Sequence, residues 1–196
     1  MSSVCKKWGY EVESAKDLYV VLFISRNKDN KDVKNFKERR MSFITTTNII
    51  TDFNDEKLME KFEDFVNNGV SKEMSRFYIS VNARSPEKVR KGLIHFLIDE
   101  PNFNLAHIDS KLASIAQQKD CASEKKWMFD FDINDVEKFE EFLDDVGFNL
   151  VNAFKTPNGY AVITKHFDTR ELLKKWGDSV TLKRDDMLCY EWSRKA

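Results

Sequence analysis

Short apolar runs separated by polar segments predict a chain rich in β-strands. The runs contain many Val, Ile, Phe and Thr residues, which are the types that pack well in sheets. The last two runs lie on either side of Asp185 and Asp186 and are typical of a closing pair of strands. The predicted strands cover residues 18–25, 41–50, 76–83, 126–133, 149–155, 160–164, 180–184 and 188–192.

Helical spacing and capping residues predict helices between these strands. Ser85 followed by Pro86 is a strong start signal, because Ser caps helix N-termini and Pro fits the first turn. Gly147 and Gly177 follow apolar-periodic segments and are typical of helix ends. The predicted helices cover residues 55–66 after the cap Asn54, 86–97, 135–146, and a segment from the caps Asp168 and Thr169 to residue 176, with one further helix within 99–124.

Composition indicates a folded domain rather than a disordered chain. The 196 residues are 41% apolar and include 16 phenylalanines, enough to bury a sizeable core. The alternation of elements predicts a mixed α+β fold, with a central, mostly antiparallel sheet flanked by helices. We expect a single domain over residues 1–196, in which residues 1–75 are a candidate N-terminal lobe.

Charge and cysteine content narrow the environment in which the chain works. Lys and Arg number 32 against 33 Asp and Glu, so no global positive field indicates a nucleic-acid partner, although residues 26–40 are locally basic and predict an exposed arm. The three widely spaced cysteines are typical of reduced thiols. No run approaches the roughly 18 apolar residues of a membrane span. We therefore expect a cytoplasmic protein without membrane partners.

An Asp-x-Asp pattern carries the chemistry of this sequence. Strand alternation over residues 126–133 directs Asp130 and Asp132 to one face, about 7 Å apart along the strand. Like charges this close repel each other unless a cation intervenes, which predicts a divalent metal ion as partner. A solvated acidic strand face explains the same alternation equally well.

Three motifs give the chain a family resemblance, which covers residues 76–192. The Asp-x-Asp strand, the turn at residues 156–160 that enters a strand, and the later Asp185-Asp186 resemble the motifs of the archaeo-eukaryotic primase superfamily in order and spacing. This superfamily includes phage and plasmid primase-polymerases. The resemblance implies that Asp130, Asp132 and Asp186, with Asp185 as the alternative third ligand, bind Mg2+ or Mn2+ for catalysis. Ala161 stands where the family pattern has a histidine that binds nucleotide phosphates.

Further residues around these motifs are candidates for binding a nucleotide or its phosphates. Arg84 precedes a predicted helix N-terminus, where backbone N–H groups favour anions. Basic side chains flank the Asp-x-Asp strand and the hairpin, and a solvated rim explains each of them equally well. The candidates are Arg84, Lys126, Asn158, Gly159, Lys165 and His166.

Three functional hypotheses follow from these residues. In the first, the chain is a phage-like primase-polymerase relative that binds a nucleoside triphosphate and DNA or RNA, acts as a nucleotidyltransferase in replication, and works in the host cytoplasm if it is viral. In the second, the same scaffold is a non-catalytic module that binds nucleic acid, a replication protein or a host protein. In the third, it is a metal-dependent nuclease or phosphodiesterase with water as nucleophile.

Overall fold

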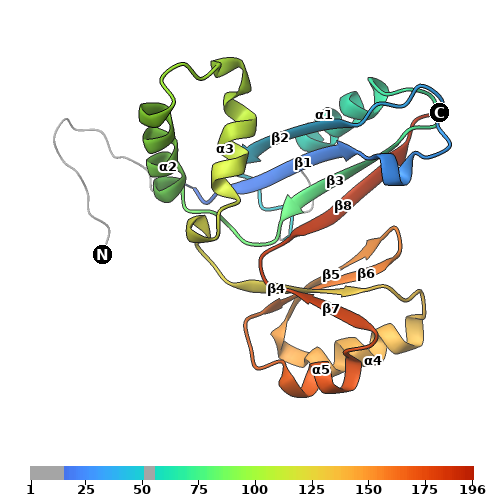
Figure 1. Cartoon of the computed structure of the whole chain (residues 1–196). Helices are drawn as coiled ribbons and strands as arrows, with labels where there is room; N and C mark the ends of the chain where they lie inside the picture. Colours follow the sequence, from blue (N-terminus) through green and yellow to red (C-terminus); the bar gives the residue numbers. More distant parts are fainter. Residues whose placement is uncertain (1–15, 51–55) are drawn as a thin grey trace.

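The strands of the computed structural model, which describes residues 16–50 and 56–196, form two antiparallel sheets (Figure 1). The strands are β1 Tyr19–Ser25, β2 Arg39–Thr45, β3 Met74–Ser80, β4 Lys126–Phe131, β5 Leu150–Thr156, β6 Gly159–Lys165, β7 Val180–Lys183 and β8 Met187–Arg194. Sheet one has the order β2-β1-β3-β8, and sheet two has the order β5-β6-β4-β7. The predicted mixed α+β class is therefore confirmed, with two sheets in place of one central sheet.

The predicted helix starts and stops correspond to capping contacts in the structure. Oγ of Ser85 accepts a hydrogen bond from the Lys88 N–H at 3.4 Å, and Oδ1 of Asp135 accepts one from the Lys138 N–H at 3.2 Å. Gly147 has a φ of 56°, a left-handed conformation that favours glycine. The predicted cap Asn54 lies outside the described residues. The helices are α1 Glu56–Asn67, α2 Pro86–Asp99, α3 Ile108–Ala116, α4 Val136–Val146 and α5 Arg170–Trp176.

Sheet two and its helices come from one continuous segment of the chain. The elements follow each other as β4-α4-β5-β6-α5-β7, with β4 and β6 at the centre of the sheet. This order is the split β-α-β arrangement of ferredoxin-like domains. Sheet one, in contrast, combines β8 from the end of the chain with strands from its first half.

A shared hydrophobic core joins the two sheets. Phe23 and Phe77 of sheet one pack with their ring centroids 4.9 Å apart, in the same buried cluster as Met128 and Ile163 of sheet two. Side chains of α1 complete this cluster on the same face of sheet one. The face of β4 that carries Met128 is therefore directed towards sheet one, and Asp130, two residues further along, shares that face.

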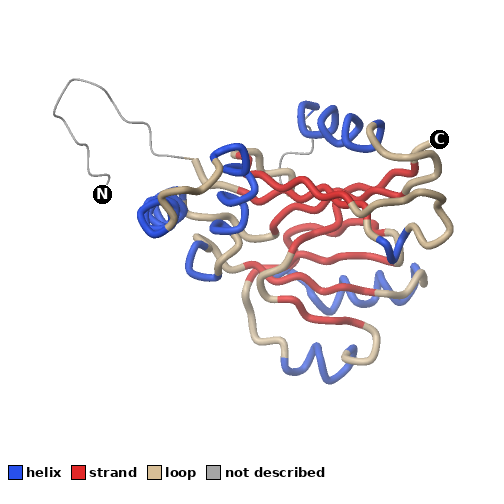
Figure 2. The backbone as a smooth tube through the Cα atoms, turned by 45° about the horizontal axis from the view of Figure 1, so that its top comes forward, coloured by secondary structure: helices blue, strands red, loops and turns tan. Residues whose placement is uncertain are grey.

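Helices cover the opposite faces of both sheets. Val20 of β1 packs with residues of α2 and α3, and Phe129 and Phe131 of β4 pack with residues of α4 and α5. Figure 1 places α4 and α5 below sheet two, and Figure 2 shows the strands of the two sheets as neighbouring layers. No helix in the described parts of the chain has the length and apolar character needed to cross a bilayer.

Two boundaries near the predicted site and the predicted arm differ from the predicted elements. Strand β4 ends at Phe131, because β6 begins at Gly159 and the last cross-strand pair is Phe131 with Tyr160. Asp132 therefore follows the strand instead of lying in it. The predicted arm over residues 26–40 is also too long, since its last two residues begin β2.

The prediction that the last two strands pair with each other is wrong. Strand β7 pairs with β4 in sheet two, whereas β8 pairs with β3 in sheet one. The turn between them is anchored by Asp185, whose carboxylate binds the buried guanidinium of Arg84. This ion pair holds the chain at the point where it passes from one sheet to the other.

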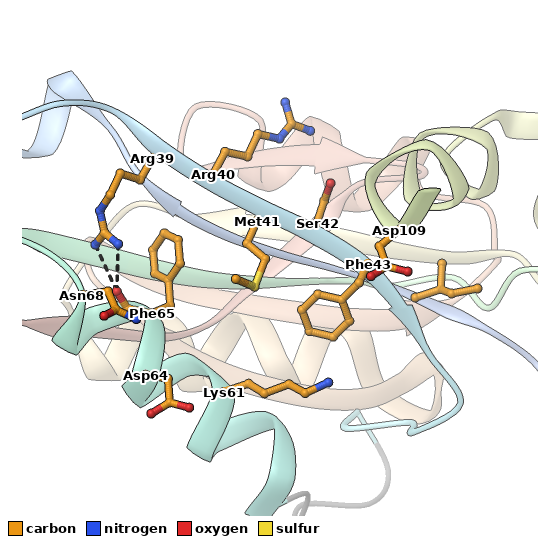
Figure 3. A pocket seen from close by; sticks show the side chains of 11 residues that line it. Arg39, Arg40, Met41, Ser42, Phe43, Lys61, Asp64, Phe65, Asn68 and Asp109 are labelled. Carbon is orange, nitrogen blue, oxygen red and sulfur yellow. Dashed lines mark hydrogen bonds between the residues drawn. The ribbon is translucent and has the colours of Figure 1, made fainter. Parts of the chain in front are cut away.

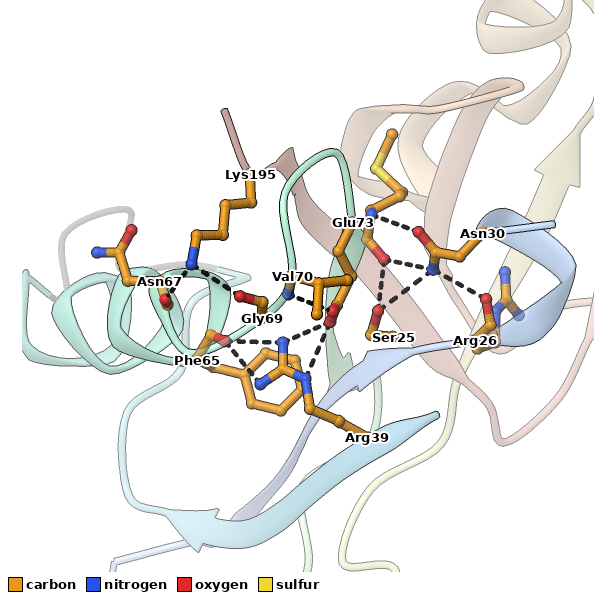
Figure 4. Close-up of polar contacts among 11 residues, drawn as sticks. Ser25, Arg26, Asn30, Arg39, Phe65, Asn67, Gly69, Val70, Glu73 and Lys195 are labelled. Atoms are coloured by element: carbon orange, nitrogen blue, oxygen red, sulfur yellow. Dashed lines mark hydrogen bonds and ion pairs between the residues drawn. The ribbon is translucent and has the colours of Figure 1, made fainter. Parts of the chain in front are cut away.

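A buried carboxylate, Glu73, ties β2 to the end of α1 (Figure 4). Its side chain is 2% exposed, and Oε1 accepts a hydrogen bond from Nε of Arg39 at 2.9 Å. Oε2 accepts the Val70 N–H at 2.9 Å, and the Arg39 guanidinium also donates to the Phe65 carbonyl at 3.0 Å. Burial raises the pKa of Glu73, but the bonds from Val70 and Arg39 outweigh it, so the pKa lies below its ordinary value.

Glu73→Gln should lower the free energy of unfolding by about 1.5–3 kcal/mol at pH 7, because it removes a buried charge from Arg39. Since the folded-state pKa is depressed, this contribution is present above the ordinary value of 4.5 and is lost as the pH falls through the folded-state pKa. Urea unfolding of both proteins at neutral and acidic pH measures the difference, which should shrink in acid. A difference of equal size at both pH values would contradict this assignment.

Candidate functional site

Two of the predicted acids meet around a lysine that sequence reasoning missed. Nζ of Lys183, on β7 beside β4, donates to Oδ2 of Asp130 at 2.7 Å. The same Nζ lies 3.7 Å from Oδ2 of Asp186, which follows β7. The side chains of Asp130, Lys183 and Asp186 are 25%, 32% and 49% exposed, so solvent and ligands reach all three.

The third predicted acid acts on the same lysine through its charge. Burial lowers the pKa of Lys183, but the hydrogen bond that it donates to Asp130 and the charges of Asp130, Asp186 and Asp132 outweigh this effect, so the pKa is raised. The ammonium is therefore a firmly charged cation among three carboxylates. We call Asp130, Asp132, Lys183 and Asp186 the Lys183 cluster.

The register of sheet two places the departure from the family pattern directly beside this cluster. Ala161 on β6 is the cross-strand partner of Asp130, and Thr181 on β7 is its partner on the other side. Ala161 is 2% exposed and belongs to the core between the sheets. A histidine at this position would therefore lie next to Asp130, in space that sheet one now covers.

Asp185 is separated from the cluster by its own partners. Its carboxylate accepts two hydrogen bonds from Arg84, at 2.8 and 3.0 Å, and one from Nδ2 of Asn82 at 3.1 Å. The Arg84 side chain is only 3% exposed. Arg84 is thus occupied in a buried ion pair and does not present its guanidinium to a phosphate at the surface, and Asp186 is the aspartate of this turn that reaches Lys183.

The other predicted phosphate ligands lie at the two ends of β4. Asn158 lies in the β5–β6 turn and Gly159 is the first residue of β6, at the end of β4 where Asp132 follows the strand. Lys126 and Lys165 are cross-strand partners at the opposite end, four residues or about 13 Å from Asp130. Lys126 is paired there with Glu124 at 2.7 Å.

His166 also lies away from the Lys183 cluster. Its ring meets the ring of Trp127 edge-on, with the centroids 4.5 Å apart. Trp127 is directed to the face of β4 opposite to Asp130, because strand residues alternate between faces. Of the predicted phosphate ligands, the turn at Asn158 and Gly159 is therefore at the end of β4 nearest the acids.

The donor chemistry of the cluster suits a hard divalent cation. Carboxylate oxygens from Asp130 and Asp186 converge on one positive group, and oxygen ligands of this type are preferred by Mg2+ and Mn2+. In the described residues, no three His, Cys, Asp or Glu side chains are grouped closely enough to hold a metal ion. The ammonium of Lys183 lies between Asp130 and Asp186, so a metal ion bound by these two carboxylates would have to displace it.

The sequence did not predict Lys183 as a site residue, because its contact with Asp130 depends on the pairing of β7 with β4. Alternation in β7 directs Thr181 and Lys183 to one face, but only the pairing with β4 brings Lys183 beside Asp130. The available signal was a lysine three residues before Asp186 in a run already predicted as a strand.

Comparisons with protein-family models, with curated proteins and with solved structures find no match for this chain. The resemblance to the primase superfamily therefore stays a prediction that rests on the order of its motifs. The arrangement of side chains in the Lys183 cluster is the remaining basis for a functional proposal.

Proposed function

We propose that this protein binds a nucleoside triphosphate together with Mg2+ or Mn2+ at the Lys183 cluster, as a relative of the primase-polymerases. The observation that carries the proposal is the convergence of Asp130 and Asp186, which are 56 positions apart in sequence, on the single cation Lys183. Both carboxylates are partly exposed, so a metal ion could reach them from the solvent.

The residues of the cluster would divide the work of binding. Asp130 and Asp186 would hold the metal ion, and Asp132 would add negative charge beside it. Lys183, once displaced from the carboxylates, would pair with a phosphate oxygen of the nucleotide. A bound Mg2+ or Mn2+ polarises phosphate oxygens and stabilises the charge that develops on them.

Calorimetric titration of the full chain with MnCl2, and with MnCl2 plus ATP, tests this proposal. We expect metal-dependent ATP binding by the wild type and a loss of at least about tenfold in affinity for Asp130→Asn, because one charged ligand is removed. Asp168→Asn is the matched control, since Asp168 is also an exposed aspartate paired with a cation, Arg170. The proposal fails if the wild type shows no metal-dependent binding, or if both variants lose affinity equally.

Lys183→Met separates the two parts of the site. Without the competing ammonium, Mn2+ alone should bind more tightly, whereas Mn2+ with ATP should bind less tightly because a phosphate partner is missing.

Incorporation of nucleotides into a primed oligonucleotide by the wild-type protein would indicate a nucleotidyltransferase. Release of nucleotides from the same oligonucleotide would indicate a nuclease instead.

A second candidate is a non-catalytic nucleic-acid-binding module on the same scaffold. The burial of Ala161 beside Asp130 favours it, because the phosphate-binding histidine of the family pattern is absent from that position. This candidate predicts that a labelled single-stranded oligonucleotide binds in the presence of EDTA, with equal affinity for wild type and Asp130→Asn. Binding that requires a divalent metal would exclude it.

A further inference from the structure

Strand β2 forms an open edge of sheet one. It pairs with β1 along its whole length, from Arg39 opposite Ser25 to Thr45 opposite Tyr19. Among the residues that the structure describes, no strand pairs with its other side. Alternate N–H and C=O groups of β2 therefore point away from the sheet, and such an edge is a template for another strand.

A pocket lies beside this edge on the face covered by α1. Its volume is about 710 Å3, and Met41, Phe43 and Phe65 provide its apolar lining (Figure 3). Met41 is 47% exposed, which is unusual for a large apolar residue in a strand. Lys61 and Asp64 of α1 lie across the pocket from β2, and Nζ of Lys61 lies 5.0 Å from the Phe43 ring centroid.

A second pocket, of about 610 Å3, lies on the face covered by α3. Arg40 and Ser42 of β2 line it together with Asp109 and Ser110 of α3. The two pockets share Arg40, Met41 and Ser42 of β2 and Asp109 of α3, so they adjoin each other along the same edge. A strand added to β2 would place alternate side chains in the two pockets.

The pockets beside β2 contain equal numbers of positive and negative side chains that form no ion pairs among the described residues. Apart from Arg39, the first pocket is lined by two cations, Arg40 and Lys61, and two anions, Asp64 and Asp109. Arg40 and Asp109 also line the second pocket. None of these four takes part in an ion pair within the described parts of the chain. A partner that carried one sign of charge would leave two of them facing a like charge.

Charged side chains give β2 little protection against pairing with another strand. Charged side chains on an edge strand normally prevent pairing with another copy. Arg39, however, is directed inward to Glu73 and the Phe65 carbonyl (Figure 4). Arg40 is thus the single arginine of β2 whose side chain is left without such a partner in the described residues.

We propose that β2 pairs antiparallel with β2 of a second copy of this chain, across a two-fold axis at Ser42. This register sets Met41 opposite Phe43 of the second copy, and Phe43 opposite its Met41, which covers the exposed methionine with an apolar neighbour. Arg40 then faces Ile44 rather than another arginine. The two four-stranded sheets become one continuous sheet through the dimer.

The two-fold axis also explains the charge balance. In an isologous contact the same surface patch of both copies meets across the two-fold axis. A cation in this patch can therefore pair with an anion of the second copy only if the patch itself contains both charges. Lys61 approaches Asp64 of the second copy, and Arg40 approaches Asp109 of the second copy. Four charges that have no ion-pair partner within residues 16–50 and 56–196 therefore become complementary pairs, which a uniformly acidic peptide or a nucleic acid would not achieve.

Sedimentation equilibrium of the full chain, over about a hundredfold range of concentration, tests this proposal. We expect a monomer–dimer equilibrium, and Met41→Lys should raise the dissociation constant at least about tenfold because the change occurs twice in each dimer. Asp64→Lys should weaken the dimer by placing two lysines against each other. The double variant Lys61→Asp with Asp64→Lys should restore it, since the charges are exchanged but remain complementary.

Glu60→Lys is the matched control, because Glu60 is an exposed acid of α1 outside both pockets. Circular dichroism establishes that each variant is folded. Hydrogen exchange of the β2 amides should slow as the protein concentration rises. A monomer at every concentration, or a dimer indifferent to both Met41→Lys and Asp64→Lys, would overturn the proposal.

Discussion

Asp185→Ala is expected to destabilise the protein by about 3–5 kcal/mol, because it leaves the buried guanidinium of Arg84 without its counter-charge. Arg84 donates two hydrogen bonds to Asp185, and its buried Nε has no hydrogen-bond partner among the residues that the structure describes. The contact joins the segment between β3 and α2 to the turn between β7 and β8, where the chain passes between the sheets. Urea unfolding at neutral pH measures the loss.

Asp186→Ala is the matched control for this prediction, because the two aspartates are neighbours in sequence with different partners. Asp186 is exposed and lies 3.7 Å from Lys183, so its removal should change the stability by less than about 1 kcal/mol. It should instead weaken metal-dependent ATP binding. Equal destabilisation by both substitutions would contradict the distinct roles assigned to Asp185 and Asp186.

The parts of the fold that depend on local sequence were predictable. The Ser85 cap and Pro86 start a helix wherever it lies in the molecule, and Gly147 ends one because its φ of 56° suits glycine. Strand runs rich in β-branched and aromatic residues were likewise found near their observed positions. These signals act within a few residues, so the rest of the fold does not alter them.

The parts that depend on contacts between distant segments were not predictable. The last two strand runs resemble a hairpin locally, but the buried pair of Arg84 and Asp185 assigns them to different sheets. Similarly, the alternation that directs Asp132 to the face of Asp130 breaks where β6 stops pairing with β4. Neither effect has a signature in the residues next to it.

The candidate site also contains residues that the sequence predicted and a residue that only the strand pairing reveals. The order of acidic motifs indicated Asp130 and Asp186 as members of one site, and both reach Lys183. The lysine itself could not be chosen from the many others without the register between β7 and β4. His166, which is close to the motif in sequence, is directed to the other face of sheet two and contacts Trp127.

Gly159→Ala should lower the free energy of unfolding by about 3 kcal/mol or more, although the substitution adds only one methyl group. A Cβ at this position would lie 2.0 Å from the Phe131 carbonyl oxygen and 3.1 Å from the Ile133 nitrogen. Both are backbone atoms, so neither can move aside without separating β6 from β4. Gly159 is therefore required by strand packing, independently of any nucleotide.

Gly147→Ala provides the comparison for this second large effect. Its Cβ would meet no atom of the described residues within 4 Å, so the cost is that of the left-handed backbone, about 1–2 kcal/mol. Urea unfolding of the two variants beside the wild type should rank Gly159→Ala as clearly the less stable. If Gly159→Ala costs no more than Gly147→Ala, the close approach of β6 to β4 is wrong, and with it the placement of Ala161 beside Asp130.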